Sequence, residues 1–195
     1  MTAKRAATGD YSLSDGRPRC SWVRDVPLDV QYHDEEWGVP VHDDRLLFEL
    51  LTLEGAQAGL SWLTVLQRRA GYQRVFKKFN PRAVAKFDDG VVAAILGDEG
   101  VIRHRQKIES VVNNAHAVLE MQKRHGSLGR YLWGLGTAEG ESVTVSKSMS
   151  KQLKKDGFKF VGPTICHSLR QASGMVNDHS TTCFRQVEIK ISGRK

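Results

Sequence analysis

The sequence lacks the features that define several broad classes of protein. No apolar run in its 195 residues approaches the roughly 20 residues that a membrane-spanning helix needs. The first residues carry charge but no apolar core segment, which argues against a secretory signal. Three cysteines, an odd number, argue against a disulfide framework. We therefore expect a cytoplasmic protein without membrane association, in a reducing compartment where clustered thiols would bind a metal.

Also missing are internal repeats, a nucleotide-type glycine-rich fingerprint and any long alternation of period two. The apolar residues follow the helical period instead, most clearly over residues 108–119. Asp43 or Asp44 can cap an apolar helix that runs through Leu53. These patterns predict an all-α fold. Further helices are expected over residues 61–69, 72–79, 88–96, 148–156 and 164–172, with a loop over 137–146.

The length is sufficient for one domain with a sizeable core. Residues 1–18 are rich in helix breakers and lack apolar periodicity, so we expect a disordered tail there. A single domain is predicted over residues 19–184, followed by a basic C-terminal tail over 185–195.

Acidic and basic residues are unevenly distributed along the chain. The net charge is +7, and residues 100–160 hold 11 basic against 5 acidic side chains, a balance of +6. Residues 20–99 have a balance of −4, from 9 basic and 13 acidic side chains. This asymmetry indicates a polyanion bound by one side of the molecule. A solvated, lysine-rich helical face is the alternative.

One acidic residue, Glu54, lies in the otherwise uncharged stretch 50–66. Burying a carboxylate is costly unless it has a partner or a task. Gly55 and Gly59 indicate a tight bend beside it, and Trp62 follows. An acid beside an indole suits a planar, electron-poor ligand. The alternative is a helix corner with a capping Glu and a core Trp.

Residues 97–108 predict a glycine-bounded hairpin between two helices. Backbone N–H groups and a helix N-terminus that meet at one point form a phosphate site, which Arg103, Arg105 and Lys107 would reinforce. A plain helical hairpin with a solvated basic flank is equally compatible with the pattern.

Cysteine and histidine residues occur near both ends of the expected domain. His179 and Cys183 have the spacing of a zinc half-site, and Cys20 and His33 lie near the start. Two thiolates and two imidazoles would form a closed tetrahedral zinc site. Sequence alone does not establish that the two pairs meet, and incidental residues remain an alternative. Cys166 and His167 are competing candidates.

Four aromatic residues accompany these motifs: Trp22, Tyr32, Trp37 and Trp62. Each taken singly is most simply a core residue. Together with a lone glutamate they could line a pocket that stacks a planar base.

Several blocks carry a family resemblance. They are residues 20–22, 32–40, 53–62, 100–105 with Lys107, 154–161, and 176–179 with Cys183. In these blocks the chain resembles the 3-methyladenine-DNA glycosylase I family, over roughly residues 19–184. The resemblance implies a helix-hairpin-helix DNA glycosylase that acts in base excision repair in the bacterial cytoplasm. Its partners would be alkylated double-stranded DNA and the released 3-methyladenine, and we expect a monomer.

The resemblance also implies roles for individual residues. Glu54 would be the catalytic residue of the base pocket, and Gly59 with Leu60 would enter the gap left by the flipped nucleotide. Gly100 would belong to the DNA-binding hairpin. The implied base-binding residues are Tyr32, Trp37 and Trp62, with Trp22 as their neighbour. The implied ligands of a structural zinc ion are Cys20, His33, His179 and Cys183.

The chain departs from the expected pattern in three places. Ala56 stands where a Gln is expected, which could alter the wall near Glu54. The hairpin lacks the Leu-Pro-Gly-Val-Gly of most helix-hairpin-helix glycosylases. No counterpart of the catalytic Asp of that wider superfamily can be identified, which fits a family that works without it.

The chemistry of the implied substrate predicts a simple mechanism. N3-alkylation makes adenine cationic and a good leaving group, so flipping the base and offsetting its charge are the main tasks. No lysine lies in the pocket stretch to form a Schiff base, so we expect no lyase step. A non-enzymatic helix-hairpin-helix DNA-binding module is the rival function. A zinc hydrolase would need an open metal position, which four protein ligands remove.

Overall fold

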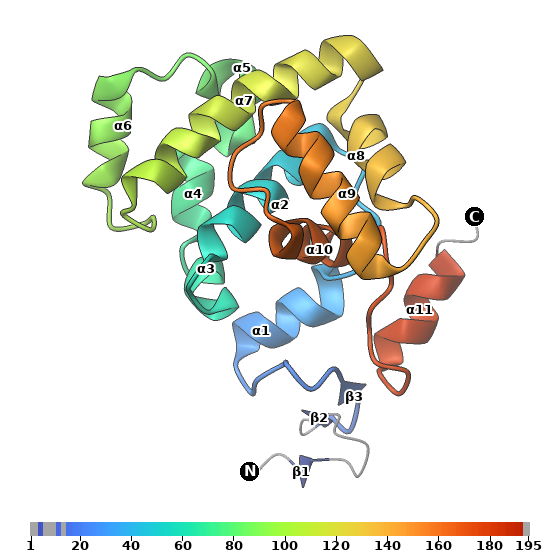
Figure 1. Ribbon diagram of the computed structural model, residues 1–195. Coiled ribbons are helices and arrows are strands. Elements are labelled where there is room, and N and C mark those ends of the chain that lie inside the picture. The colour runs from blue at the N-terminus through green and yellow to red at the C-terminus, as the bar shows by residue number, and fades with distance from the viewer. Residues whose placement is uncertain (1–3, 6–10, 13–14, 193–195) are drawn as a thin grey trace. The chain divides into compact units, whose positions relative to one another are not determined.

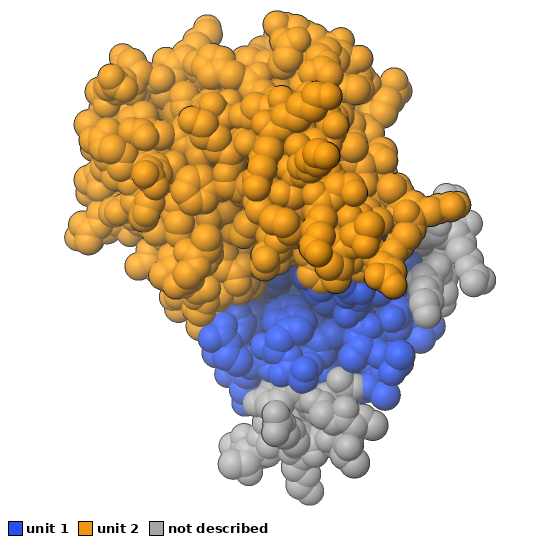
Figure 2. All heavy atoms as spheres, in the orientation of Figure 1, with its two compact units in different colours: residues 1–40, 171–195 blue, residues 41–170 orange. Residues whose placement is uncertain are grey.

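The computed structural model describes residues 4–5, 11–12 and 15–192, which are mostly helical (Figure 1). They divide into two compact units, residues 1–40 with 171–195 and residues 41–170 (Figure 2). The predicted helical class is confirmed, although three two-residue strands are also present. Among the described residues, no helix is both long and apolar enough to cross a membrane.

The first unit combines segments from both ends of the chain. Its antiparallel strands pair Arg5 with Tyr11 and Ser12 with Pro18. Pro27 opens a helix whose second part, from Tyr32 to Glu36, is a π-helical turn. The elements of this unit are β1 (Lys4–Arg5), β2 (Tyr11–Ser12), β3 (Pro18–Arg19), α1 (Pro27–Gln31), the π-helical turn η1 (Tyr32–Glu36) and α11 (Phe184–Ser192).

The second unit is built around α2, Asp44–Gln57. Asp43 caps this helix by accepting hydrogen bonds from the N–H groups of Arg45 and Leu46, as the sequence predicts. All ten residues from Leu47 to Ala56 are buried, so the helix is enclosed on every side. The other elements are α3 (Trp62–Leu66), α4 (Arg69–Val75), the 3₁₀ turn η2 (Lys77–Phe79), α5 (Pro81–Val84), α6 (Asp89–Leu96), α7 (Arg105–His125), α8 (Leu128–Gly136) and α9 (Ser142–Lys155). Helix α10 (Pro163–Ala172) ends at the boundary of the two units.

Helix α7 confirms the clearest periodic pattern of the sequence. It packs against α2, α5, α6 and α8, and its apolar face is buried (Figure 1). The side chains that form this face are Ile108, Val111, Ala115, Val118 and Met121. Helix α7 begins directly after the α6–α7 hairpin, residues 97–104, which lies against α4.

Helix α9 differs from the prediction. The loop expected over residues 137–146 ends early, because α9 begins at Ser142 rather than near Ser148. The run Ser142–Ser146 is rich in β-branched residues, which have modest helix propensity. The buried Arg170 of α10 stabilises it by donating to the carbonyl and hydroxyl of Ser142 and to the hydroxyl of Ser146. This tertiary contact is not encoded in the local pattern.

The predicted tails are only partly described. Much of residues 1–18 lies outside the described residues, and β1 and β2 are the parts of residues 1–14 that the structure describes. Helix α11 occupies most of the predicted C-terminal tail. The division into 1–18, 19–184 and 185–195 stays a prediction.

Candidate active site and metal centre

Glu54 lies in the last two turns of the buried helix α2. Its side chain is only 4 % exposed, and burial raises the pKa of its carboxyl to about 8. Among the described residues, none forms a hydrogen bond or ion pair with this carboxyl. A buried titratable group without a protein partner is typical of a ligand-binding site.

The second buried carboxylate of α2 shows the contrast. Glu49, one and a half turns earlier, accepts a hydrogen bond from Arg69 Nε at 2.6 Å and another from Gln73 Nε2 at 2.9 Å. Its charge is therefore compensated within the protein, and it ties α2 to α4. Glu49 has a structural role, which leaves Glu54 as the carboxyl of α2 with capacity for a ligand.

The chain turns sharply after α2. Ala58 leaves the helical conformation, and Gly59 has a φ of +80°, a value that side chains rarely allow. The Leu60 side chain is 40 % exposed at the tip of this turn. Ser61 then caps α3 by accepting a hydrogen bond from the Thr64 N–H at 3.2 Å. An exposed leucine on a capped, tight turn is suited to insertion into an apolar gap.

The α6–α7 hairpin, residues 97–104, lies against α4. A Cβ at Gly71 would lie 2.0 Å from the carbonyl oxygen of Gly100, so the approach of hairpin and helix requires glycine. Asp98 holds the hairpin by accepting from the Gly100 N–H at 2.8 Å and from the Arg74 guanidinium. Arg103 is exposed at its end. This hairpin therefore presents a basic residue to solvent from a fixed backbone.

The predicted phosphate-binding residues differ in their surroundings. Arg103 and Arg105 are exposed, and Arg105 pairs with Glu109 at 3.2 Å on the surface. Lys107 is only 8 % exposed. Its Nζ donates to the carbonyl oxygens of Ala56 at 2.9 Å and Ala58 at 2.7 Å. The surroundings of Lys107 do not favour a direct contact with phosphate.

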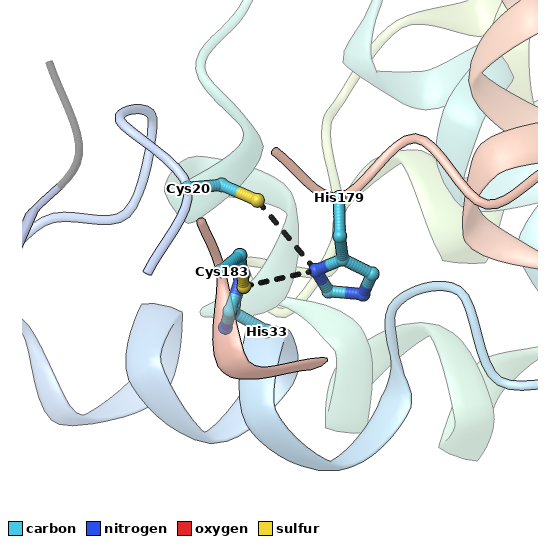
Figure 3. Close-up of side chains that lie close together, drawn as sticks. All are labelled: Cys20, His33, His179 and Cys183. Carbon is cyan, nitrogen blue, oxygen red and sulfur yellow. Dashed lines mark hydrogen bonds between the residues drawn. The ribbon is translucent and has the colours of Figure 1, made fainter. Parts of the chain in front are cut away.

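The first unit contains a compact group of cysteine and histidine residues (Figure 3). Cys20, His33, His179 and Cys183 are all buried, and their ligand atoms lie within 4.8 Å of one another. His179 Nδ1 is 3.5 Å from both sulfur atoms, and His33 Nε2 is 3.4 Å from Cys183 Sγ. In a tetrahedral zinc site, sulfur and nitrogen ligands lie about 3.5 Å apart. The four residues therefore fit a zinc ion, and they could hold a metal.

Neighbouring groups orient these four side chains. His33 Nδ1 lies 2.8 Å from Asp34 Oδ1, and His179 Nε2 lies 3.0 Å from the Trp37 carbonyl oxygen. In the tautomers that donate to these acceptors, the other ring nitrogen of each histidine faces the cysteines. Arg19, itself buried, donates to Asp34 at 2.6 Å. Burial raises the pKa of Asp34, but the bonds from Arg19 and His33 outweigh it and leave that pKa lowered.

The two thiols of this group share their protons unequally. The hydrogen bond between them raises the pKa of Cys20 and lowers the pKa of Cys183. A divalent cation would stabilise both as thiolates, as zinc coordination requires. The competing candidates do not join this group: the Cys166 thiol donates to the Val161 carbonyl, and His167 lies beside Ser142.

Aromatic residues surround the metal-type group within the first unit. The Trp22 ring lies 5.1 Å from that of Trp37 and 6.5 Å from that of Tyr32, measured between centroids. Trp37 also packs against His179 at 4.5 Å. Trp22 is 39 % exposed, whereas Tyr32 and Trp37 are buried. These contacts support the histidines, and a role in stacking a base stays a prediction for all three.

The structure places several of the predicted site residues next to one another, in two separate groups. In the second unit, Glu54, Leu60 and Trp62 share the α2–α3 corner, with Lys107 bound to its backbone. In the first unit, the four metal-type ligands meet. Sequence reasoning missed Arg19 and Asp34, although an acid directly after a histidine is a possible signal for a carboxylate that orients it.

Comparisons with known proteins identify the family. The family model for methyladenine glycosylase matches residues 22–186. DNA-3-methyladenine glycosylase 1 of Escherichia coli (strain K12) is 44 % identical over 177 residues, which cover 85 % of this chain and 95 % of that protein. The chain therefore belongs to the methyladenine glycosylase family, and it is an enzyme of that family.

Solved structures of 3-methyladenine DNA glycosylase I also match this chain. A crystal structure of 3-methyladenine DNA glycosylase I, 44 % identical, matches with a TM-score of 0.80 over 85 % of this chain and 98 % of that one. A substituted 3-methyladenine DNA glycosylase I, solved in complex with 3-methyladenine, is 30 % identical. It matches with a TM-score of 0.80 over 86 % of this chain and 97 % of that chain.

Proposed function

We propose that this chain is a monofunctional DNA glycosylase that hydrolyses the N-glycosidic bond of 3-methyladenine in alkylated double-stranded DNA. The reaction would begin base excision repair and release the free base. The names of the relatives support this substrate, and one solved relative is bound to 3-methyladenine. The observation in this chain that carries the proposal is Glu54, a buried carboxyl that has no hydrogen-bond or ion-pair partner among the described residues.

The carboxyl of Glu54 matches the charge of the proposed base. N3-methylation gives adenine in DNA a positive charge, and a carboxylate in a low-dielectric site offsets that charge while it accepts a hydrogen bond. Unmodified adenine is neutral and would leave the carboxylate uncompensated. Glu54 would therefore discriminate between the two bases by charge. The cationic base leaves readily, so water can attack the sugar without a covalent nucleophile on the protein.

The other proposed contacts follow from the same chemistry. Leu60, exposed on its tight turn, would fill the gap that the flipped nucleotide leaves. Gly59 allows that turn, and the hairpin at Gly100 with Arg103 and Arg105 would hold the phosphate backbone. The proposed base-binding aromatic residues are Tyr32, Trp37 and Trp62, with Trp22 beside them. Their assignment rests on the sequence resemblance.

We infer a structural role for zinc at Cys20, His33, His179 and Cys183. The donor set of two sulfur and two nitrogen atoms fits zinc, and four protein ligands fill its coordination without an open position for water. When bound, zinc would hold the two ends of the chain together by coordination alone. The chemistry of base release is assigned to other residues, and a zinc hydrolase is correspondingly disfavoured.

One lysine, Lys107, bears on the proposed absence of a lyase step. Helix α7 brings Lys107 next to the Glu54 stretch, although no lysine lies within that stretch. A lysine that forms a Schiff base must present an unprotonated amine. Burial lowers the pKa of Lys107, which favours that unprotonated form. Its Nζ, however, donates to two carbonyls and is buried, which leaves it poorly placed as a nucleophile.

One experiment tests the proposed function directly. The protein is incubated with duplex DNA that carries 3-methyladenine, and the released base and the DNA strand are both analysed. Free 3-methyladenine with an intact strand is the expected result. DNA binding without base release would instead support the rival binding module, and strand cleavage would contradict the monofunctional assignment.

The proposed DNA contact predicts a specific salt dependence. Replacing both Arg103 and Arg105 with Gln should weaken binding to unmodified duplex and make the slope of log affinity against log salt shallower by about 2, because each phosphate contact contributes about 1. Both side chains are exposed, so the fold should be retained. Titrations at several salt concentrations measure the slope, and an unchanged slope would place the DNA on another face.

A further inference from the structure

Lys107 has an unusual environment for a surface-type residue. It lies in the first turn of α7, three residues after the hairpin ends, and its side chain is 8 % exposed. Its Nζ reaches two carbonyl oxygens at the end of α2, at 2.9 Å on Ala56 and 2.7 Å on Ala58. One ammonium group therefore binds both sides of Gln57, at the point where α2 ends.

The two contacts satisfy a need that α2 does not meet itself. The last carbonyl groups of a helix have no partner within the helix, and a cation at that end interacts favourably with the helix dipole. Helix α2 has no basic residue in its last turn. Lys107 supplies both the hydrogen bonds and the charge from a helix that is 49 to 51 residues away in sequence.

The carbonyl groups that Lys107 binds lie between Glu54 and Leu60 in the sequence. Ala56 follows Glu54 by two residues, and Ala58 precedes Leu60 by two. Fixing both peptide groups sets the direction in which the chain leaves the helix. It therefore sets the position of the Leu60 turn relative to Glu54, and ties both to the α7 end of the hairpin.

We propose that Lys107 is a positioning residue, which binds the carbonyls of Ala56 and Ala58 and thereby holds Glu54 and Leu60 in a fixed relation to the hairpin. The inference rests on the proposed function of those residues in base release. It replaces the expectation that Lys107 contacts a DNA phosphate, and it differs from a role as a Schiff-base nucleophile. These roles use the same nitrogen atom in different ways, so experiments can separate them.

The test compares Lys107→Met with Arg103→Gln, a matched loss of one positive charge. Each variant is measured for the single-turnover rate of 3-methyladenine release, and for the salt dependence of binding to unmodified duplex. Lys107→Met should release the base about ten- to a hundredfold more slowly, because small misplacements of reacting groups are costly. Its salt slope should equal that of the parent, whereas Arg103→Gln should change the slope by about 1.

A conservative variant distinguishes positioning from general packing. Lys107→Arg keeps the charge and several donors, and it should recover most of the rate that Lys107→Met loses. Lys107→Gln, which retains a donor without the charge, should lie between them and serves as the test if Lys107→Met does not fold. A slope change in Lys107→Met like that of Arg103→Gln, or base release at the parent rate, would overturn the proposal.

Hydrogen exchange separates this proposal from the proposed function. The Leu60 N–H donates to the Gln57 carbonyl at 2.6 Å, so its exchange reports on the turn that Lys107 holds. In Lys107→Met this amide should exchange at least tenfold faster, while amides in the middle of α7 keep the parent rate. If the parent releases no base, the proposed function fails, but this readout still decides the role of Lys107: unchanged exchange at Leu60 refutes it.

Discussion

Glu54→Gln should release 3-methyladenine from DNA roughly tenfold to a hundredfold more slowly than the parent protein. The amide is nearly isosteric, but it cannot offset the positive charge of the base, and its NH₂ group can face a donor. Losing one charge-assisted hydrogen bond costs on the order of 1.5–3 kcal/mol. Because the methylated base supplies most of its own activation, we expect no larger loss. Single-turnover release from duplex DNA measures it, with binding to unmodified duplex as the control.

The pH dependence of the parent should reveal the same group. Burial raises the pKa of Glu54 to about 8, so the free protein holds this carboxyl mainly protonated at neutral pH. Its ionised form is the one that offsets a cationic base. The kcat/KM of the parent should therefore fall as the pH drops below about 8, and Glu54→Gln should lack this limb. The difference between the two proteins should be largest above pH 8. Equal rates at pH 8.5, with both proteins folded, would remove Glu54 from the mechanism.

As the pH rises, the free energy of unfolding of the parent should fall, whereas its kcat/KM should rise. The folded-state pKa of Glu54 is raised from 4.5 to about 8, so the unfolded chain loses this proton first as the pH rises. The parent therefore loses stability between about pH 4.5 and 8, by on the order of 4 kcal/mol. Relative to the parent, Glu54→Gln should gain stability over this window. Denaturant unfolding at pH 5.5, 7 and 9 tests the trend, and a constant difference between the two proteins would contradict it.

The helices that position the site could be predicted from sequence where the apolar period was long and well capped. Helix α7 follows its apolar period over nearly four turns, from Ile108 to Met121, and Asp43 caps α2 as its position indicates. The burial of Glu54 could be predicted because its charge interrupts an otherwise uncharged and largely apolar run. In both cases, a local pattern carried enough information.

Interactions between distant segments could not be predicted in the same way. The sequence suggests a half-site at His179 and Cys183, but its meeting with Cys20 and His33 joins residues about 150 positions apart. The burial of Lys107 could not be predicted either, because a lysine in a basic segment is ordinarily solvated. Its burial depends on the end of α2, which the sequence around Lys107 does not contain. Local periodicity specifies which face a helix buries, but it does not specify which distant group satisfies a helix terminus.

Cys183→Ala, which removes one of the proposed zinc ligands, should destabilise the protein more than substitutions at Glu54, Arg103 or Lys107. Purified protein should contain about one zinc per chain, and Cys183→Ala should lose it, because the remaining three ligands bind zinc far more weakly. A thousandfold weaker affinity removes about 4 kcal/mol of the stability that bound metal provides. For a chain of this size, that corresponds to a fall in Tm of about 10 °C. Elemental analysis and thermal unfolding measure the two effects.

Cys166→Ala provides the matched control, since it also removes a buried thiol but lies outside the four-residue group. It should keep the zinc and lose only the modest stability expected of a small cavity. The two variants should also differ in where they loosen. In Cys183→Ala, amides near Cys20, His33 and His179 should exchange faster, because the metal would join these segments of the first unit. Amides in α7 should stay protected, since the core of the second unit does not depend on the metal. Equal zinc content and equal Tm in the two variants would show that these four residues meet for another reason.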